Sequence, residues 1–105
     1  MTMTFGIGAK EQELDAVAEI LAEIFEVKFD QRESSFRGGD YCWAESPEGE
    51  LILQHNRELP EDEPFESGWP IDQLILYIDG EDDYSWQNGI HALETTQRIG
   101  VGRLK

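Results

Sequence analysis

The sequence has few basic residues and only one cysteine, and each scarcity excludes a class of partner or structure. Eight Lys and Arg residues against 23 Asp and Glu residues give a net charge of −15. Nucleic acids and anionic membranes are bound through Lys and Arg that neutralise phosphate, so we expect neither as a partner. The single cysteine, Cys42, cannot form an intramolecular disulfide bond.

The usual motifs of catalytic and metal-binding sites are also missing. His55 and His91 are the only histidines, and neither lies in a metal-ligand spacing. Cys42 lies in a strand-like run, where a lone cysteine is expected in the core. The acidic run at residues 79–83 does not match an EF-hand loop, which has glycine at its sixth position and glutamate at its twelfth. We therefore expect no enzymatic activity, no cofactor and no metal.

Long apolar runs are absent as well. No window approaches the length of a membrane span, and residues 1–9 lack the basic start and apolar stretch of a signal peptide. We therefore expect a cytoplasmic protein. A chain of 105 residues with 39% hydrophobic residues is expected to form one domain, residues 1–105, around a single core. We expect a monomer or a weak dimer.

The pattern of hydrophobic residues predicts both strands and helices. Met3, Phe5 and Ile7 alternate with Thr and Gly, which predicts a strand with one buried face. From Leu14 to Phe25, apolar residues recur at helical spacing and predict an amphipathic helix. The run from Leu74 to Ile78 is apolar throughout, so we expect a central strand there.

Weaker patterns complete the predicted fold. Strand-like segments at 27–31, 41–44 and 51–53 surround the turn signal at 46–49, and the last two should form a hairpin. Ser85 is the candidate cap of a second short helix, and residues 99–104 suggest a final short strand. This order of elements favours an α+β fold, with two helices packed on one face of a mostly antiparallel sheet of about four to six strands.

The segment from Arg32 to Tyr41 should make the central reversal of the chain, since a glycine pair supplies the positive φ angles of a tight turn. Two arginines in it lie close in sequence to Glu33 and Asp40. They either anchor the loop by pairing with carboxylates or take part in binding. The candidate loop anchors are Arg32, Arg37, Gly38, Gly39 and Asp40.

Acidic residues gather in two further segments and on the first helix. Residues 57–70 carry three prolines and predict an exposed loop or edge segment, and a second acidic run follows the central strand. Acids next to aromatic residues have the composition of a protein interface. The candidate partner-binding residues are Glu58, Glu61, Asp62, Glu63, Glu66, Trp69, Asp79, Glu81, Asp82, Asp83 and Tyr84. Asp15, Glu19 and Glu23 form either a docking face or an ordinary solvated face of the first helix.

The acidic amphipathic helix, the segment Arg32 to Tyr41 and the run Leu51 to Asn56 together resemble small bacterial immunity proteins. These proteins protect a cell against polymorphic toxins, including those of contact-dependent growth inhibition systems. The resemblance covers roughly the middle half of the chain and implies stoichiometric inhibition of a toxin domain. The net charge adds that the partner should be basic, as a nuclease is.

Two alternatives stay open. The chain is either a phosphate-mimicking inhibitor of another DNA-binding protein, or a small non-enzymatic ligand-binding or structural domain whose acidity serves solubility. An immunity protein should bind one basic protein, a mimic several, and a domain that is acidic only for solubility none.

Overall fold

The computed structural model describes residues 2–34, 39–58, 63–80 and 86–104. Its elements follow the chain as β1 (Thr2–Lys10), the 3-10 turn η1 (Glu11–Glu13), α1 (Leu14–Phe25), β2 (Asp30–Ser34), β3 (Gly39–Ser46), β4 (Gly49–His55), β5 (Gln73–Gly80), α2 (Gln87–Thr95) and β6 (Gly100–Arg103). None of the helices in these ranges is long and apolar enough to cross a membrane.

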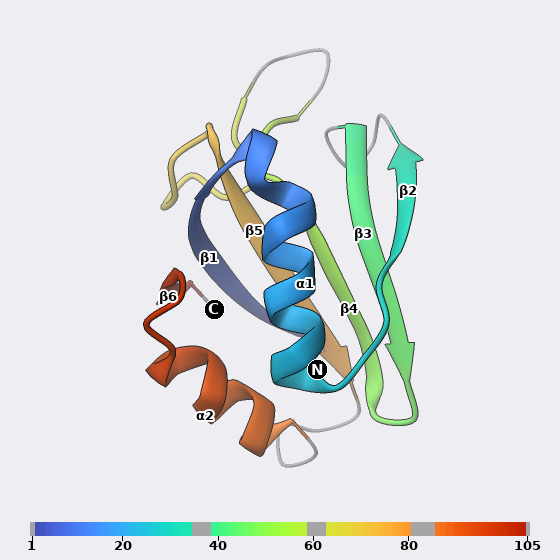
Figure 1. The fold of residues 1–105 in the computed structure, drawn as a ribbon. Coiled ribbons are helices and arrows are strands. Elements are labelled where there is room, and N and C mark those ends of the chain that lie inside the picture. The colour runs from blue at the N-terminus through green and yellow to red at the C-terminus, as the bar shows by residue number, and fades with distance from the viewer. Residues whose placement is uncertain (1, 35–38, 59–62, 81–85, 105) are drawn as a thin grey trace.

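The strands form one six-stranded sheet in the order β2-β3-β4-β5-β1-β6. Every neighbouring pair is antiparallel. Both helices pack on one face of this sheet, with α1 lying across the central strands and α2 near β6 (Figure 1). The predicted α+β fold is therefore confirmed, at the upper end of the expected number of strands.

Helix α1 covers the sheet with the stripe that the periodicity predicts. Leu14, Val17, Ala18 and Leu21 are buried, and Phe25 packs against the same core. The helix ends at Glu26, which has a left-handed backbone with φ of 55° and donates its backbone N–H to the carbonyl of Ala22.

Helix α2 packs against the end of α1. Trp86, at its N-cap position, is buried and meets the Phe25 ring edge to face, with the ring centroids 6.0 Å apart. Gly89 weakens an isolated helix, but a Cβ atom there would lie 2.5 Å from the Phe25 ring. Close packing between the helices therefore requires this glycine. The expected cap, Ser85, lies outside the described residues.

The centre of the sheet is buried on both faces. Strand β5 lies between β4 and β1, as its apolar sequence predicts, and Leu74, Ile75 and Leu76 are all fully buried. The expectation of a single buried face was wrong for β1, because Thr4 and Gly6 are buried as well as Met3, Phe5 and Ile7. Something other than the helices covers the second face of β1.

The predicted boundary of β2 was also wrong. The strand does not begin at Val27 but at Asp30, and it continues through Arg32 to Ser34, which the sequence assigned to the reversal. Because the left-handed turn at Glu26 redirects the chain, Val27 and Phe29 pack against the core from an irregular segment. The reversal ends at Gly39, whose φ of 103° confirms that a glycine is needed there.

Candidate functional site

The two faces of the sheet differ in what covers them. Side chains alternate along each strand, and those of Phe5, Leu53 and Leu76 pack under the helices. We call the opposite side the helix-free face. Register and alternation assign to it Thr2, Thr4, Gly6, Tyr41, Trp43, Glu45, Glu50, Ile52, Gln54, Ile75, Tyr77 and Asp79.

One end of the helix-free face is covered by the segment before β5. The Trp69 ring lies directly over Gly6, where a Cβ atom would come within 2.2 Å of ring carbon Cδ2, and it also contacts Gly102 on β6. Its indole N–H donates to the carbonyl of Ile7 at 3.3 Å. The two glycines therefore make room for one tryptophan, which explains why Gly6 is buried on the helix-free face of β1.

The side chain of Asn56 holds this segment in place. Asn56 is fully buried, and its amide nitrogen Nδ2 lies 3.0 Å from the carbonyl oxygen of Glu66, 2.8 Å from that of Trp69 and 3.2 Å from that of Pro70. Its Oδ1 atom accepts the backbone N–H of Glu66 at 2.7 Å. A buried amide with both ends engaged stabilises an irregular segment that lacks its own secondary structure.

At the opposite end of this face, three carboxylates lie side by side. The strand register sets Glu45 opposite Glu50, and Glu50 opposite Asp79, so one acid from each of β3, β4 and β5 forms a line across the sheet. We call Glu45, Glu50 and Asp79 the acidic row. The line ends on β1 at Thr2, whose hydroxyl donates to Asp79 Oδ1 at 3.3 Å.

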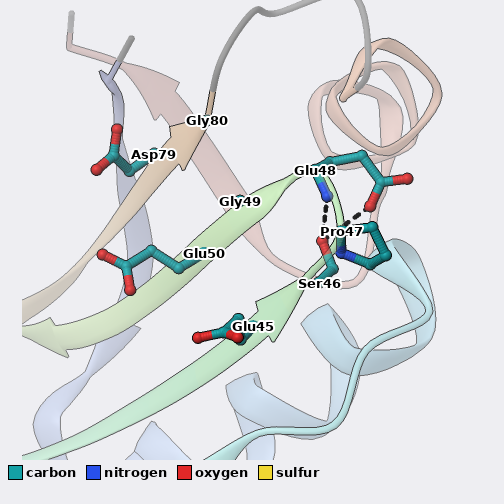
Figure 2. A pocket seen from close by; sticks show the side chains of 8 residues that line it. All are labelled: Glu45, Ser46, Pro47, Glu48, Gly49, Glu50, Asp79 and Gly80. Atoms are coloured by element: carbon teal, nitrogen blue, oxygen red, sulfur yellow. Dashed lines mark hydrogen bonds between the residues drawn. The ribbon is translucent and has the colours of Figure 1, made fainter.

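A shallow hollow of about 570 Å³ lies beside the acidic row, at the β3–β4 turn and the end of β5. In Figure 2 the carboxylates of Glu45, Glu50 and Asp79 point to the same side, whereas that of Glu48 turns toward Ser46. The Ser46 hydroxyl donates to Glu48 Oε2 at 2.9 Å. The three carboxylates of the row therefore lie on the same side of the sheet, because the pleat and register of the three strands orient their side chains in one direction.

Trp43 borders the acidic row. Its indole N–H donates to Glu50 Oε2 at 2.8 Å, which fixes the middle carboxylate of the row. The guanidinium carbon of Arg32, on the neighbouring β2, lies 4.0 Å from the centroid of the Trp43 ring. An aromatic ring, an arginine and three acids therefore share one partly exposed surface.

The acidic row lowers the stability of the sheet. Like charges directly opposite each other on neighbouring strands are destabilising, by an amount of about 0.2 to 1 kcal/mol per pair, and the row contains two such pairs. Glu45 is exposed and Glu50 partly exposed, so solvent screens part of this repulsion. Alternation of Lys with Glu would have stabilised the same positions.

The structure places the predicted partner-binding residues in several different environments. Glu58 and Glu63 are exposed and form an isolated backbone bridge, in which the Glu58 N–H donates to the Glu63 carbonyl at 2.6 Å. Glu66 and Trp69 are only partly exposed, since Glu66 Oε1 accepts the hydroxyl of Tyr77 at 3.0 Å. Residues 64–70 form no helix or strand and are mostly exposed, so the predicted exposed loop or edge segment is confirmed there except at Phe65, Glu66 and Trp69, which are partly buried.

Asp79 is the one predicted partner-binding residue that belongs to the acidic row. Six further predicted partner-binding residues, together with two of the candidate anchors, lie outside the described residues. They are Glu61, Asp62, Glu81, Asp82, Asp83, Tyr84, Arg37 and Gly38.

Among the remaining candidate anchors, Arg32 stacks on the ring of Trp43, and no ion pair between Arg32 and a carboxylate of the described residues accompanies this contact. Glu33 and Asp40 stand opposite each other on β2 and β3, so these two neighbouring acids repel. Gly39 has the positive φ of the turn.

Two members of the acidic row, Glu45 and Glu50, were not among the sequence-based candidates. The signal for them was present, because a two-residue turn at Pro47 and Glu48 sets Ser46 opposite Gly49 and therefore Glu45 opposite Glu50. The third member required knowledge that β5 pairs with β4, which sequence spacing does not supply.

The described ranges hold no group of three or more His, Cys, Asp or Glu side chains placed to hold a metal ion. Within them His91 is exposed, whereas His55 is largely buried, with its Nδ1 atom 3.7 Å from a carboxylate oxygen of Glu11. Arg57 donates to the other oxygen of Glu11 at 2.8 Å, so this cluster joins η1, just before α1, to the end of β4.

Cys42 lies on the helix side of β3 and is 1% exposed. The pKa of its thiol is raised to about 11, mainly by burial and also by the neighbouring charges of Asp15 and Asp40. A thiol that stays protonated at neutral pH is a poor nucleophile, which agrees with a role in packing.

Comparison with known proteins adds no relative to this geometry, since no family model matches the chain and no curated protein matches it.

Proposed function

We propose that this protein is a cytoplasmic immunity protein that binds a cognate basic toxin domain, of the nuclease class, and neutralises it by covering its active or nucleic-acid-binding surface. The observation that carries the proposal is the acidic row on the helix-free face. Three carboxylates from three strands are aligned there although their repulsion costs stability. A basic partner removes that cost, because its Lys and Arg side chains replace repulsion with attraction.

Further features of the chain support a protein partner. A net charge of −15 attracts a basic domain over a long range and speeds the encounter. Trp43 beside the row supplies an aromatic side chain of the kind that anchors interfaces, and Glu50 and Arg32 hold its ring in place. The resemblance to immunity proteins supplies the toxin as the class of partner.

A pull-down from a lysate of the source species, at low and at high salt, tests the proposal. The lysate is supplemented with the C-terminal domain of any large exported protein encoded next to this chain. We expect recovery of one basic toxin domain, and stoichiometric loss of its nuclease activity when the purified chain is added. Higher salt should weaken the recovery, because steering by exposed charges is screened.

Recovery of several unrelated DNA-binding proteins would instead identify a phosphate mimic. Recovery of no basic protein at either salt concentration would contradict the proposal and leave acidity for solubility as the explanation of the charge. A toxin domain that is bound but retains full activity would contradict neutralisation while preserving the binding surface.

A further inference from the structure

A base lies among the acids of the helix-free face. Arg32 stands opposite Tyr41 in the register of β2 and β3, and Tyr41 belongs to that face. Residues directly opposite each other in an antiparallel pair share a face, so Arg32 lies on it as well. Its side chain is exposed, on the strand at the edge of the sheet next to β3 (Figure 1). The chain has only eight Lys and Arg residues, so a base at this position needs a local explanation.

Trp43 joins this base to the acidic row. The guanidinium carbon of Arg32 lies 4.0 Å from the centroid of the Trp43 ring, and the indole N–H donates to Glu50 Oε2 at 2.8 Å. The tryptophan thus contacts a base on the face of its ring and an acid at its edge. These contacts restrict the ring, and the stacking orders the guanidinium beside the row.

The guanidinium of Arg32 keeps hydrogen-bond donors for a partner. Asp30 is two residues away on the same side of β2, yet no ion pair joins Arg32 to Asp30 or to another carboxylate of the described ranges. Stacking uses the flat face of a guanidinium and leaves the N–H groups along its edge in the planar arrangement that binds a carboxylate through two hydrogen bonds. A partner's carboxylate can therefore pair with Arg32 at a reduced entropic cost, because the stacking has already ordered the side chain.

The mixed charge of this surface bears on the kind of partner. A surface that imitates nucleic acid needs negative charge alone, because every phosphate that it replaces is negative. A base beside the acids repels the Lys and Arg of a partner surface that binds only phosphate. Arg32 next to the acidic row therefore fits a partner surface in which a carboxylate lies among the bases.

We propose that Arg32 is a specificity-determining residue of the interface, which pairs with a carboxylate of the partner while the acidic row pairs with the surrounding Lys and Arg. The inference rests on the proposed function, since it assigns a further contact on the same helix-free face. Trp43 lies between the two kinds of contact. A basic domain without a carboxylate at that place is bound more weakly, and the chain thereby distinguishes its cognate partner from other basic proteins.

The probe that tests this inference is the basic toxin domain recovered in the pull-down, whose dissociation constant with the full chain is measured by titration. Arg32→Gln and Lys28→Gln make the same change in net charge at exposed positions, and Lys28 lines a groove beside α1. Removing either base makes the chain more acidic, so long-range attraction alone predicts equal or tighter binding of a basic domain. We expect Arg32→Gln instead to weaken binding about tenfold or more, and Lys28→Gln to leave it within about twofold.

A second measurement separates a direct contact from a role in holding Trp43. Arg32→Lys keeps the charge and supplies a primary amine, which a carbodiimide couples to a carboxylate in direct contact. The amide bond forms, and the reagent takes up the released water and becomes a urea. We expect mass spectrometry of the coupled complex to show residue 32 joined to an Asp or Glu of the toxin domain. Lys28 in the same complex is the internal control and should not be joined to the partner.

Two outcomes would overturn the assignment of Arg32 and leave the proposed function standing. Either Arg32→Gln binds the toxin domain as tightly as Lys28→Gln does, or binding falls but residue 32 is joined to no carboxylate of the partner. The second result would mean that Arg32 only holds the ring of Trp43. Recovery of no basic domain by the unmodified chain would contradict the proposed function, and this inference with it.

Discussion

The two faces of the sheet are built from the same strands but from different chemistry. The helix side of β1, β4 and β5 is apolar, with Phe5, Leu53 and Leu76 fully buried. The helix-free face alternates with it residue by residue, yet it carries the acidic row and two buried polar side chains, Thr4 and Gln54. The first arrangement maximises apolar burial, whereas the second holds like charges together. From this difference we infer that the helix side supplies most of the stability of the fold, and that the helix-free face can therefore carry charged side chains that do not stabilise it.

The largest expected loss of stability comes from truncating a buried side chain on the helix side of the sheet. Phe5→Ala should lower the free energy of unfolding by about 3 to 5 kcal/mol, because a fully buried aromatic side chain leaves a cavity. Trp43→Ala, on the partly exposed part of the helix-free face, should cost clearly less. Urea denaturation of both variants gives the comparison. Equal costs would show that the two faces contribute alike to stability.

A smaller loss of stability should follow from disturbing the contact between Trp69 and Gly6 on the helix-free face. Gly6→Ala drives a methyl group into the Trp69 ring and should cost about 1 to 3 kcal/mol. Gly8→Ala is the control, since the nearest atom to its added Cβ is 3.4 Å away. In a Trp69→Ala background the Gly6 substitution should become nearly neutral. If its cost stays unchanged there, the ring does not cover β1 as described.

The buried thiol of Cys42, on the helix side, predicts that the free energy of unfolding depends on pH. The folded pKa of Cys42, about 11, lies above its ordinary value of 9.0. The stability gained by keeping this thiol neutral is therefore fully present below about pH 9 and is lost as pH rises toward 11. Between about pH 8 and pH 10 the chain should lose about 1 kcal/mol more than its Cys42→Ala variant, measured by urea denaturation. Parallel pH profiles would show that the thiol does not titrate from a buried site.

The smallest expected change in stability has the opposite sign. Glu50→Gln removes the middle charge of the acidic row but keeps an acceptor for Trp43, so it should raise the free energy of unfolding by about 0.2 to 1 kcal/mol. The gain should shrink with added salt. Glu94→Gln, at an exposed position on α2, provides the matched control. A loss of stability at position 50 would mean that the row is not under repulsion.

Much of the fold was predictable because local periodicity reports which residues are buried. The stripe of α1 and the apolar run of β5 follow from their spacing alone. The start of β2 was not predictable in this way, since Val27 and Phe29 look like strand residues but pack against the core from an irregular segment after the turn at Glu26. The apolar character of Val27 and Phe29 correctly indicates that they are buried. Their backbone conformation, however, is set by the left-handed residue Glu26 at the end of α1.

The candidate site was predictable only in part, since it depends on pairing between distant strands. The β3–β4 turn fixes the facing of Glu45 and Glu50 from sequence. The approach of Asp79 depends on β5 pairing with β4, and the position of Trp69 depends on the buried amide of Asn56. Neither contact leaves a spacing signal. Runs of acids in sequence therefore pointed to the loops, whereas the aligned acids come from three separate strands.

The most direct test of the account is the association rate of the recovered basic toxin domain with a variant whose acidic row is neutral: Glu45→Gln, Glu50→Gln and Asp79→Asn combined. The control carries Glu13→Gln, Asp72→Asn and Glu94→Gln, which change the net charge equally at exposed positions outside the row. At low salt the first triple variant should associate about tenfold more slowly, or slower still, and the control close to the unmodified rate. Equal rates for the two variants would contradict the assignment of the acidic row as the binding surface.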